Sequence, residues 1–168
     1  MPEKKTIERA RKDKREGKSA STQAGEFVRE EIHHIREGKH GARSAKQAIA
    51  IGLSKARRAG VKLPPPKPGT TSPETRRKAE HDLEKGAESH PETSGQRGEA
   101  TLEALEREGH AAASPRALAR QARSAARQRT PAERSAAARK AAQTKGAAGR
   151  SAAARKAAKT RAARRAGG

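Results

Sequence analysis

The sequence predicts a mostly α-helical protein with extensive disorder: a small helical hairpin head, a flexible spacer and an Ala/Lys/Arg-rich tail of nascent helices. Large apolar side chains are scarce, and nine of the fifteen lie between positions 27 and 63. No stretch of the chain shows the alternation of apolar and polar residues that is typical of strands. Alanine makes up 24 of the last 58 residues, which favours helix but offers little surface to bury.

Residues 1–20 are expected to form a basic N-terminal arm, and residues 21–61 the helical hairpin head. The first helix of the head should begin after Ser21 or Thr22 and end near Glu37. One face of this helix carries the apolar residues Ala24, Val28, Ile32 and Ile35. This spacing predicts a helix that buries a single stripe.

The second helix of the head should begin at Ser44, which forms an S-x-x-Q capping pattern with Gln47, and should end before Gly60. Its inward stripe is rich in small residues, including Gly52, so another helix can approach closely. Burying nine large side chains stabilises the fold by no more than the cost of ordering about 40 residues. A homodimer through the head is therefore one expected source of further burial.

The remaining chain divides by composition into a Pro-rich linker, residues 62–73, a weakly acidic spacer with short helices, residues 74–110, and a basic Ala-rich repeat tail, residues 111–168. The best helix of the spacer is expected at residues 99–108. In the tail, "RSAAARKAAQTK" at 134–145 recurs as "RSAAARKAAKTR" at 150–161. "TPAE" at 130–133 predicts a capping box with Pro131 as the first helical residue.

The charge is concentrated at the C-terminal end. The whole chain has 40 Lys and Arg against 19 Asp and Glu, whereas residues 111–168 have 16 basic residues and one acidic residue. This imbalance predicts a polyanionic partner, with duplex DNA favoured, RNA as an alternative and no membrane. The only aromatic residue is Phe27, so stacking on single-stranded bases is not expected.

Several classes of site are not expected. The chain has no cysteine, and it lacks G-x-S-x-G, Walker A and H-E-x-x-H motifs, so an enzyme is not predicted. His33, His34 and His40 have no carboxylate or thiol pattern beside them that would complete a tetrahedral metal site, so we interpret them as surface histidines. No metal and no cofactor are expected. There is no signal peptide or long apolar segment, which predicts a cytoplasmic protein.

Between the two helices of the head lies the glycine-containing elbow Gly38-Lys39-His40-Gly41. It can be a simple turn, with Gly38 ending the first helix, or it can present backbone N–H groups and basic side chains to phosphate. Both uses are compatible. The candidate nucleic-acid contacts of the head are Lys39, His40, Arg43, Lys46, Lys55, Arg57 and Arg58.

In the tail, alanine-spaced cations predict binding to phosphates without base recognition. The candidate contacts are Arg123, Arg127, Arg129, Arg134, Arg139, Lys140, Lys145, Arg150, Arg155, Lys156, Lys159, Arg161, Arg164 and Arg165. The expected function is a non-enzymatic, histone-like protein that compacts or bridges duplex DNA. The alternatives are an RNA- or ribosome-associated protein and a plasmid-maintenance or antitoxin-like module that binds a protein partner.

Residues 17–66, "GKSASTQAGEFVREEIHHIREGKHGARSAKQAIAIGLSKARRAGVKLPPP", resemble an uncharacterised family of small basic bacterial proteins. This domain of unknown function is often labelled a DNA-binding or plasmid-stabilisation protein. The Ala/Lys/Arg tail is similar in composition to the C-terminal domains of linker histones and to bacterial histone-like tails. Together these resemblances imply a bacterial nucleoid-associated role.

Overall fold

The computed structural model describes residues 2–88 and 95–166, apart from the side chains of residues 95–97, 144, 145, 164 and 166. Every regular element in these ranges is helical. The elements are α1 (Lys4–Arg15), α2 (Ala20–Arg36), α3 (Ala45–Arg58), α4 (Pro73–Ala87), α5 (Gly95–Glu106), the 3₁₀ helix η1 (His110–Ala113), α6 (Pro115–Arg127) and α7 (Pro131–Ala166). The chain forms two compact units, Met1–Gln121 and Ala122–Gly168.

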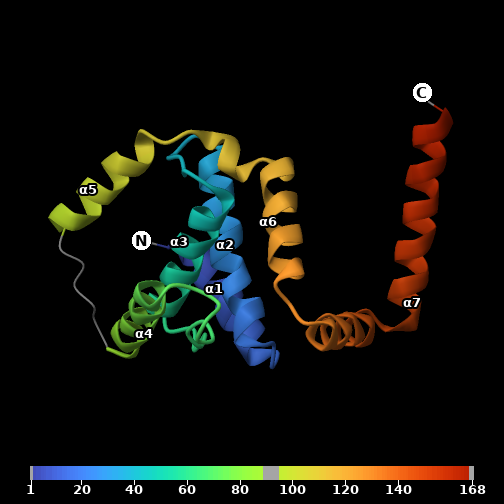
Figure 1. Cartoon of the computed structure of the whole chain (residues 1–168), viewed down its shortest axis with the longest axis horizontal. Helices are drawn as coiled ribbons and strands as arrows, with labels where there is room; N and C mark the ends of the chain where they lie inside the picture. The colour runs from blue at the N-terminus through green and yellow to red at the C-terminus, as the bar shows by residue number, and fades with distance from the viewer. Residues whose placement is uncertain (1, 89–94, 167–168) are drawn as a thin grey trace. The chain divides into compact units, whose positions relative to one another are not determined.

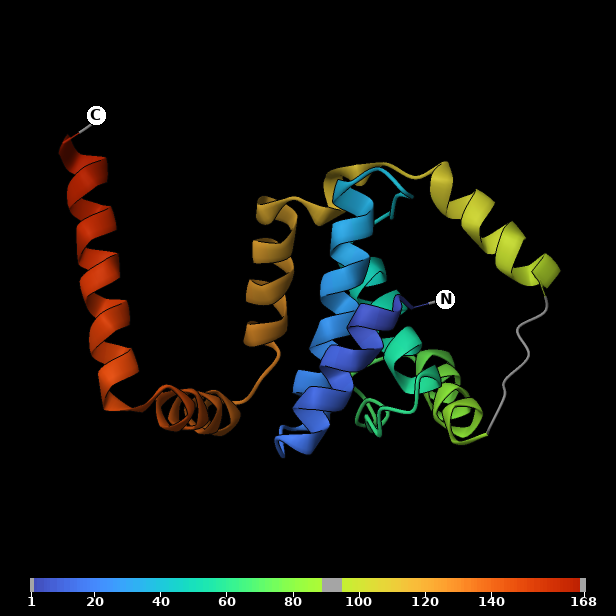
Figure 2. The same ribbon diagram turned by 180° about the vertical axis from the view of Figure 1, so that it is seen from behind.

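The first unit is built around the pair α2 and α3. Helix α1 packs on α2, α4 packs on α3, and η1 packs on both central helices (Figures 1 and 2). One cluster of buried residues centres on Ile32, Ile35 and Ala48, and a second centres on Phe27, Ala24 and Ala56. The predicted mostly helical class is therefore confirmed for the described residues.

Gly52 brings the two central helices together. A Cβ atom added there would lie 2.7 Å from Val28 Cα, closer than real Cβ atoms approach a backbone atom. The small residues of α3 thus allow another helix to pack closely, as the sequence predicts. That helix is α2 of the same chain. Ser44 caps α3 by accepting a hydrogen bond from the Gln47 N–H at 3.1 Å.

The hairpin is a wrong description of the head, because helices outside residues 21–61 complete its core. The expected N-terminal arm is helix α1, whose Ala10 is buried in the cluster of Phe27. Helix α2 starts slightly earlier than the sequence indicates, with Ser19 as its N-cap. The composition of α1 does not reveal that it packs on the core, because its apolar side consists of only Ile7 and Ala10 among many basic residues.

The expected linker and spacer also contribute to this unit. Val61 is buried and Leu63 packs beside it, while the Arg57 guanidinium donates to the carbonyl oxygens of Leu63 and Pro64 at 3.2 and 3.3 Å. Helix α4 is joined to α3 through Asp82, which accepts hydrogen bonds from Ser54 and Arg58, both at 2.6 Å. The chain is held in place by polar contacts that hydrophobic periodicity does not reveal.

The expected extensive disorder does not match the described residues, which form helices and ordered connections. From the sequence, a second copy of the chain was expected to cover the apolar faces of the two head helices. In the structure, α1, α4 and η1 of the same chain pack on these helices. Ala112 and Ala113 of η1 are both buried in the cluster of Ile32 and Ile35. A homodimer through the head stays a prediction.

In the second unit the predicted capping box of α7 is confirmed. The Thr130 N–H donates to Glu133 Oε2 at 3.0 Å, and the Glu133 N–H donates to Thr130 Oγ1 at 3.2 Å. At Gly146 the backbone has φ 63° and ψ 175°, which bends α7 sharply (Figure 1). Each copy of the sequence repeat therefore lies in its own helical segment.

Candidate functional site

Helix α6 carries four arginines at spacings of four, three and four residues: Arg116, Arg120, Arg123 and Arg127. With 3.6 residues per turn, these positions fall within about 60° of one another around the helix axis. Along the axis they extend for about 16 Å at 1.5 Å per residue. We refer to these four residues as the arginine stripe.

The arginine stripe is exposed along its whole length, and within the described part of the chain none of its members forms an ion pair. On the other side of α6, Leu118 is half-buried and packs against the cluster of Ile32 and Ile35. The helix is therefore anchored by an apolar face and presents a cationic one. Arg116 and Arg120 were absent from the candidates predicted from the sequence. The helical spacing of the arginines, with Leu118 on the opposite side, is nevertheless visible in the sequence.

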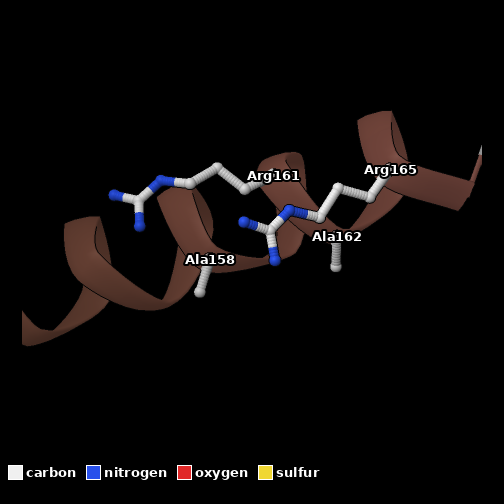
Figure 3. A pocket seen from close by; sticks show the side chains of 4 residues that line it. All are labelled: Ala158, Arg161, Ala162 and Arg165. Carbon is white, nitrogen blue, oxygen red and sulfur yellow. The ribbon is translucent and has the colours of Figure 1, made fainter. Parts of the chain in front are cut away.

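The cations of α7 are distributed differently. In its second repeat copy, Arg150, Arg155 and Lys156 point in directions roughly 100–140° apart around the helix. Figure 3 shows Arg161 and Arg165 one turn apart, with their side chains running along the same side of α7 as Ala158 and Ala162. The hollow between them is lined by one helix and is an open surface, not a pocket.

The structure places most predicted tail contacts at the surface. Within the described side chains, the predicted contacts of α6, α7 and the turn between them are all exposed. Lys145 and Arg164 lie outside the side chains that the structure describes. Arg134 and Arg150 donate to the carbonyl oxygens of Arg129 and Ala142, at 2.8 and 2.7 Å. These contacts orient the guanidinium groups without neutralising them.

Carboxylates are distributed unevenly between the units. Beyond Glu108 the only acidic residue is Glu133, which is engaged in the Thr130 capping box. In the first unit, by contrast, cations commonly pair with carboxylates, as in Arg9–Glu26, Lys18–Asp13 and Arg76–Glu80. Residues 111–168 therefore have 16 basic side chains and a single carboxylate.

Four of the predicted head contacts are exposed, and two of these four form ion pairs with carboxylates. Arg43 and Lys46 form no ion pair with any residue that the structure describes. Lys39 lies 3.1 Å from Glu37 Oε2 and 3.5 Å from Glu3 Oε1. The hydrogen bond to Glu37 is the main cause that raises the pKa of Lys39. Arg58 pairs with Asp82, so only Arg43 and Lys46 have uncommitted charges.

Three predicted head contacts are not positioned as surface phosphate ligands. His40 and Arg57 are buried, with 7% and 6% of their surface exposed. Burial lowers the pKa of Arg57, and Asp82 partly opposes this effect. Lys55 is half-buried, and its Nζ lies 2.5 Å from Glu31 Oε2. The sequence placed Arg57 away from the packed face because it could not show that α4 and residues 61–64 cover it.

The elbow is a turn packed against another segment. Gly38 has φ 76° and follows the C-cap of α2. The N–H groups of Gly41 and Ala42 donate to the carbonyl oxygens of Leu105 and Gly109, at 2.8 and 3.1 Å. A Cβ at Gly41 would lie 1.8 Å from the Glu108 carbonyl oxygen, so only glycine fits. These two N–H groups are therefore occupied, whereas Lys39 of the elbow and the nearby Arg43 remain at the surface.

The histidines differ from the interpretation as surface residues. His33 is exposed and contacts Glu37, but His40 is buried and the side chain of His34 is only 14% exposed. Glu31, His34 and His40 each place a ligand atom within 4.8 Å of the others. The sequence shows Glu31 and His34 one helical turn apart, but the approach of His40 depends on the path of the elbow.

A model of a family of unknown function, DUF6496, matches residues 4–67. This range contains α1 to α3 and the start of the linker, and it ends before α4, α6 and α7. No curated protein and no solved structure matches the chain. Among the described residues, no helix combines the length and the apolar character needed to cross a membrane.

Proposed function

We propose that this protein binds duplex DNA without base specificity, through the arginine stripe of α6 and the cations of α7. The observation that carries the proposal is the stripe: four exposed arginines on one helix face, with no carboxylate paired to them in the described chain. Guanidinium groups bind phosphate oxygens well, and neutralised phosphates release counter-ions. The first unit then acts as a folded anchor that fixes the start of α6.

The distribution of charge on α7 supports contact with phosphates over base recognition. Reading base edges requires side chains at fixed positions on a rigid element in a groove. Cations pointing in several directions from a bent, alanine-rich helix instead fit a polyanion from many sides. A chain with such a tail can hold two DNA segments together, which is the basis for a histone-like, nucleoid-associated role.

The test compares two variants that lose the same number of positive charges. In the first, the four arginines of the stripe are changed to glutamine; in the matched control, Lys4, Lys5, Arg11 and Lys14 of α1 are changed to glutamine. All eight residues are exposed. Affinity for labelled duplex DNA is measured by fluorescence anisotropy over a series of salt concentrations, with circular dichroism to confirm the fold.

The slope of log affinity against log salt is negative, and each neutralised phosphate contributes roughly 0.9 to its magnitude. We expect the stripe variant to reduce that magnitude by about 3 to 4. The control should change it by less than about 1. Equal effects of the two variants would contradict the role of the stripe, and undiminished DNA binding in molar salt would contradict the proposal as a whole. Structured RNA is the competitor: if it displaces duplex DNA at equimolar phosphate, RNA is the preferred partner and the proposal for DNA is wrong.

A further inference from the structure

Glu31, His34 and His40 form a compact polar cluster inside the first unit. Glu31 and His34 are one turn apart on α2, and His40 reaches them from the elbow. The rings of His34 and His40 are edge to face, with centroids 6.0 Å apart. Glu31 is fully buried, so its carboxylate has lost the solvation that water would supply.

Hydrogen bonding leaves two acceptor atoms of this cluster facing each other. Lys55 binds Glu31 Oε2, whereas Glu31 Oε1 receives no hydrogen bond from the described residues. His40 Nδ1 lies 3.1 Å from the Gly41 carbonyl oxygen, which can only accept, so Nδ1 must carry the proton. In the neutral ring Nε2 then has a lone pair, and it lies 3.4 Å from Glu31 Oε1.

A shared cation would resolve this arrangement. Zinc binds imidazole nitrogen and carboxylate oxygen at about 2.0–2.2 Å, so two ligand atoms at a tetrahedral angle are about 3.3 Å apart. The observed separation of 3.4 Å between His40 Nε2 and Glu31 Oε1 agrees with that value. Each of the three residues has one ligand atom within 4.8 Å of a ligand atom of the other two, so a small side-chain movement would bring His34 into range.

The surroundings resemble those of a metal-binding histidine. Histidine ligands usually donate their second ring N–H to a carbonyl or carboxylate, which fixes the ring. His40 has the Gly41 carbonyl as this partner, and His34 Nε2 lies 2.9 Å from Glu3 Oε1. Glu3 is itself held by its N–H, which donates to the Glu30 carboxylate at 3.3 Å.

We propose that Glu31, His34 and His40 bind one Zn²⁺ ion, with water as the fourth ligand. Two imidazoles and one carboxylate suit zinc and disfavour Mg²⁺ and Ca²⁺, which prefer oxygen ligands alone. Lys55 opposes a second cation, but its hydrogen bond is to Oε2 and leaves Oε1 available. The ion would fasten the elbow to α2. Because the N–H groups of Gly41 and Ala42 donate to the carbonyl oxygens of Leu105 and Gly109, zinc would also stabilise the packing of residues 105–109 against residues 41 and 42.

The test uses the full-length chain without a histidine tag, freed of nucleic acid and treated with a chelator. Zn²⁺ binding is measured by isothermal titration calorimetry and thermal stability by circular dichroism, with Mg²⁺ as the comparison ion. We expect one Zn²⁺ per chain and a higher melting temperature that the chelator reverses, since a ligand that binds only the folded state stabilises it. Mg²⁺ should produce no shift.

The variants are His34→Gln and its matched control His33→Gln on the exposed side of the same helix. Changing an outer partner of a metal ligand commonly weakens binding about 10–100-fold, so losing His34 should weaken it at least about 100-fold. The His33 variant should bind as the native chain does. If His34→Gln fails to fold, the native chain still tests the proposal. If the native chain shows neither one-to-one Zn²⁺ binding nor a shift in melting temperature, the proposal is wrong and the cluster is only a buried polar contact. Equal losses in both variants would also overturn the proposal.

Discussion

Lys18 holds the turn between α1 and α2 through two carboxylates. Its Nζ lies 2.8 Å from Asp13 Oδ1 and 2.8 Å from Glu16 Oε2. The hydrogen bond from Lys18 lowers the pKa of Glu16, and the hydrogen bonds to Asp13 and Glu16 raise the pKa of Lys18 above its ordinary value. The ion pairs of Lys18 thus connect the turn before α2 to the end of α1, and they join two exposed side chains, Lys18 and Glu16, to the buried Asp13.

The pH dependence of this contact can be predicted from both pKa shifts. Glu16 has a depressed pKa in the folded state, so its contribution is present above the ordinary value of 4.5 and is lost as pH falls through the lowered pKa. Lys18 has a raised pKa, so its contribution is complete below 10.5 and is lost as pH rises through the raised value. We therefore expect Lys18→Gln to lower the free energy of unfolding between about pH 5 and 10, with a smaller loss in molar salt.

Circular dichroism during urea unfolding checks this prediction, since the chain has no tryptophan or tyrosine. The difference between Lys18→Gln and the native chain should shrink as the solution is acidified below pH 4. Lys14→Gln removes the same charge from an exposed position of α1 and should have little effect. A deficit of Lys18→Gln that is independent of pH would show that the ion pairs are not its cause.

At the scale of helices, the pairing of α2 and α3 depends on one close backbone approach. Gly52 faces Val28, whereas Gly25, also within a helix of this unit, has no atom within 4 Å of the position of an added Cβ. The two glycines have the same intrinsic cost in a helix and opposite surroundings. They therefore separate helix propensity from packing.

We expect Gly52→Ala to destabilise the protein by about 1–3 kcal/mol because α2 and α3 must move apart to admit the methyl group. Gly25→Ala should stabilise it by roughly 0.5–1 kcal/mol through helix propensity alone. Urea unfolding followed by circular dichroism measures both. If the two substitutions changed the free energy of unfolding in the same direction, the close approach at Gly52 would not limit the packing.

Helix boundaries and caps were largely predictable from the sequence, because they depend on residues a few positions apart. Ser44 and Thr130 begin their helices as their capping patterns indicate. The packed partners were not predictable in the same way. Helix α1 has few apolar residues, and α4 is joined to α3 through Asp82, so neither carries a strong hydrophobic period. The helical spacing of the arginine stripe is visible in the sequence. It was not singled out because basic residues occur throughout the tail.

For the molecule as a whole, the boundary between the folded unit and the basic tail lies later than composition indicates. A boundary at residue 111 would separate η1 from the core, although Ala112 and Ala113 are buried and the Ala113 carbonyl oxygen accepts from Arg36 Nε at 2.9 Å. Residues 129–168 contain twelve of the forty Lys and Arg and one acidic residue. Removing them leaves the first unit and the arginine stripe together.

A chain shortened to residues 1–128 should therefore keep the thermal stability of the core of the first unit. A chain shortened to residues 1–110 should lose at least about 2 kcal/mol, since it loses buried apolar surface and a hydrogen bond to Arg36. Thermal unfolding followed by circular dichroism compares the two. Equal stability of the two shortened chains would mean that η1 and α6 do not contribute to the core.

The sequence by itself determined the helical class, the caps, the repeats and the excess of cations at the C-terminal end. These properties follow from neighbouring residues and from composition, so no knowledge of distant contacts is needed. Only the tertiary structure decided which cations are exposed, that His40 and Arg57 are buried, and that Glu31, His34 and His40 meet. Burial and proximity depend on the packing of segments remote in sequence, and polar contacts such as those of Asp82 leave no periodic signal along the chain.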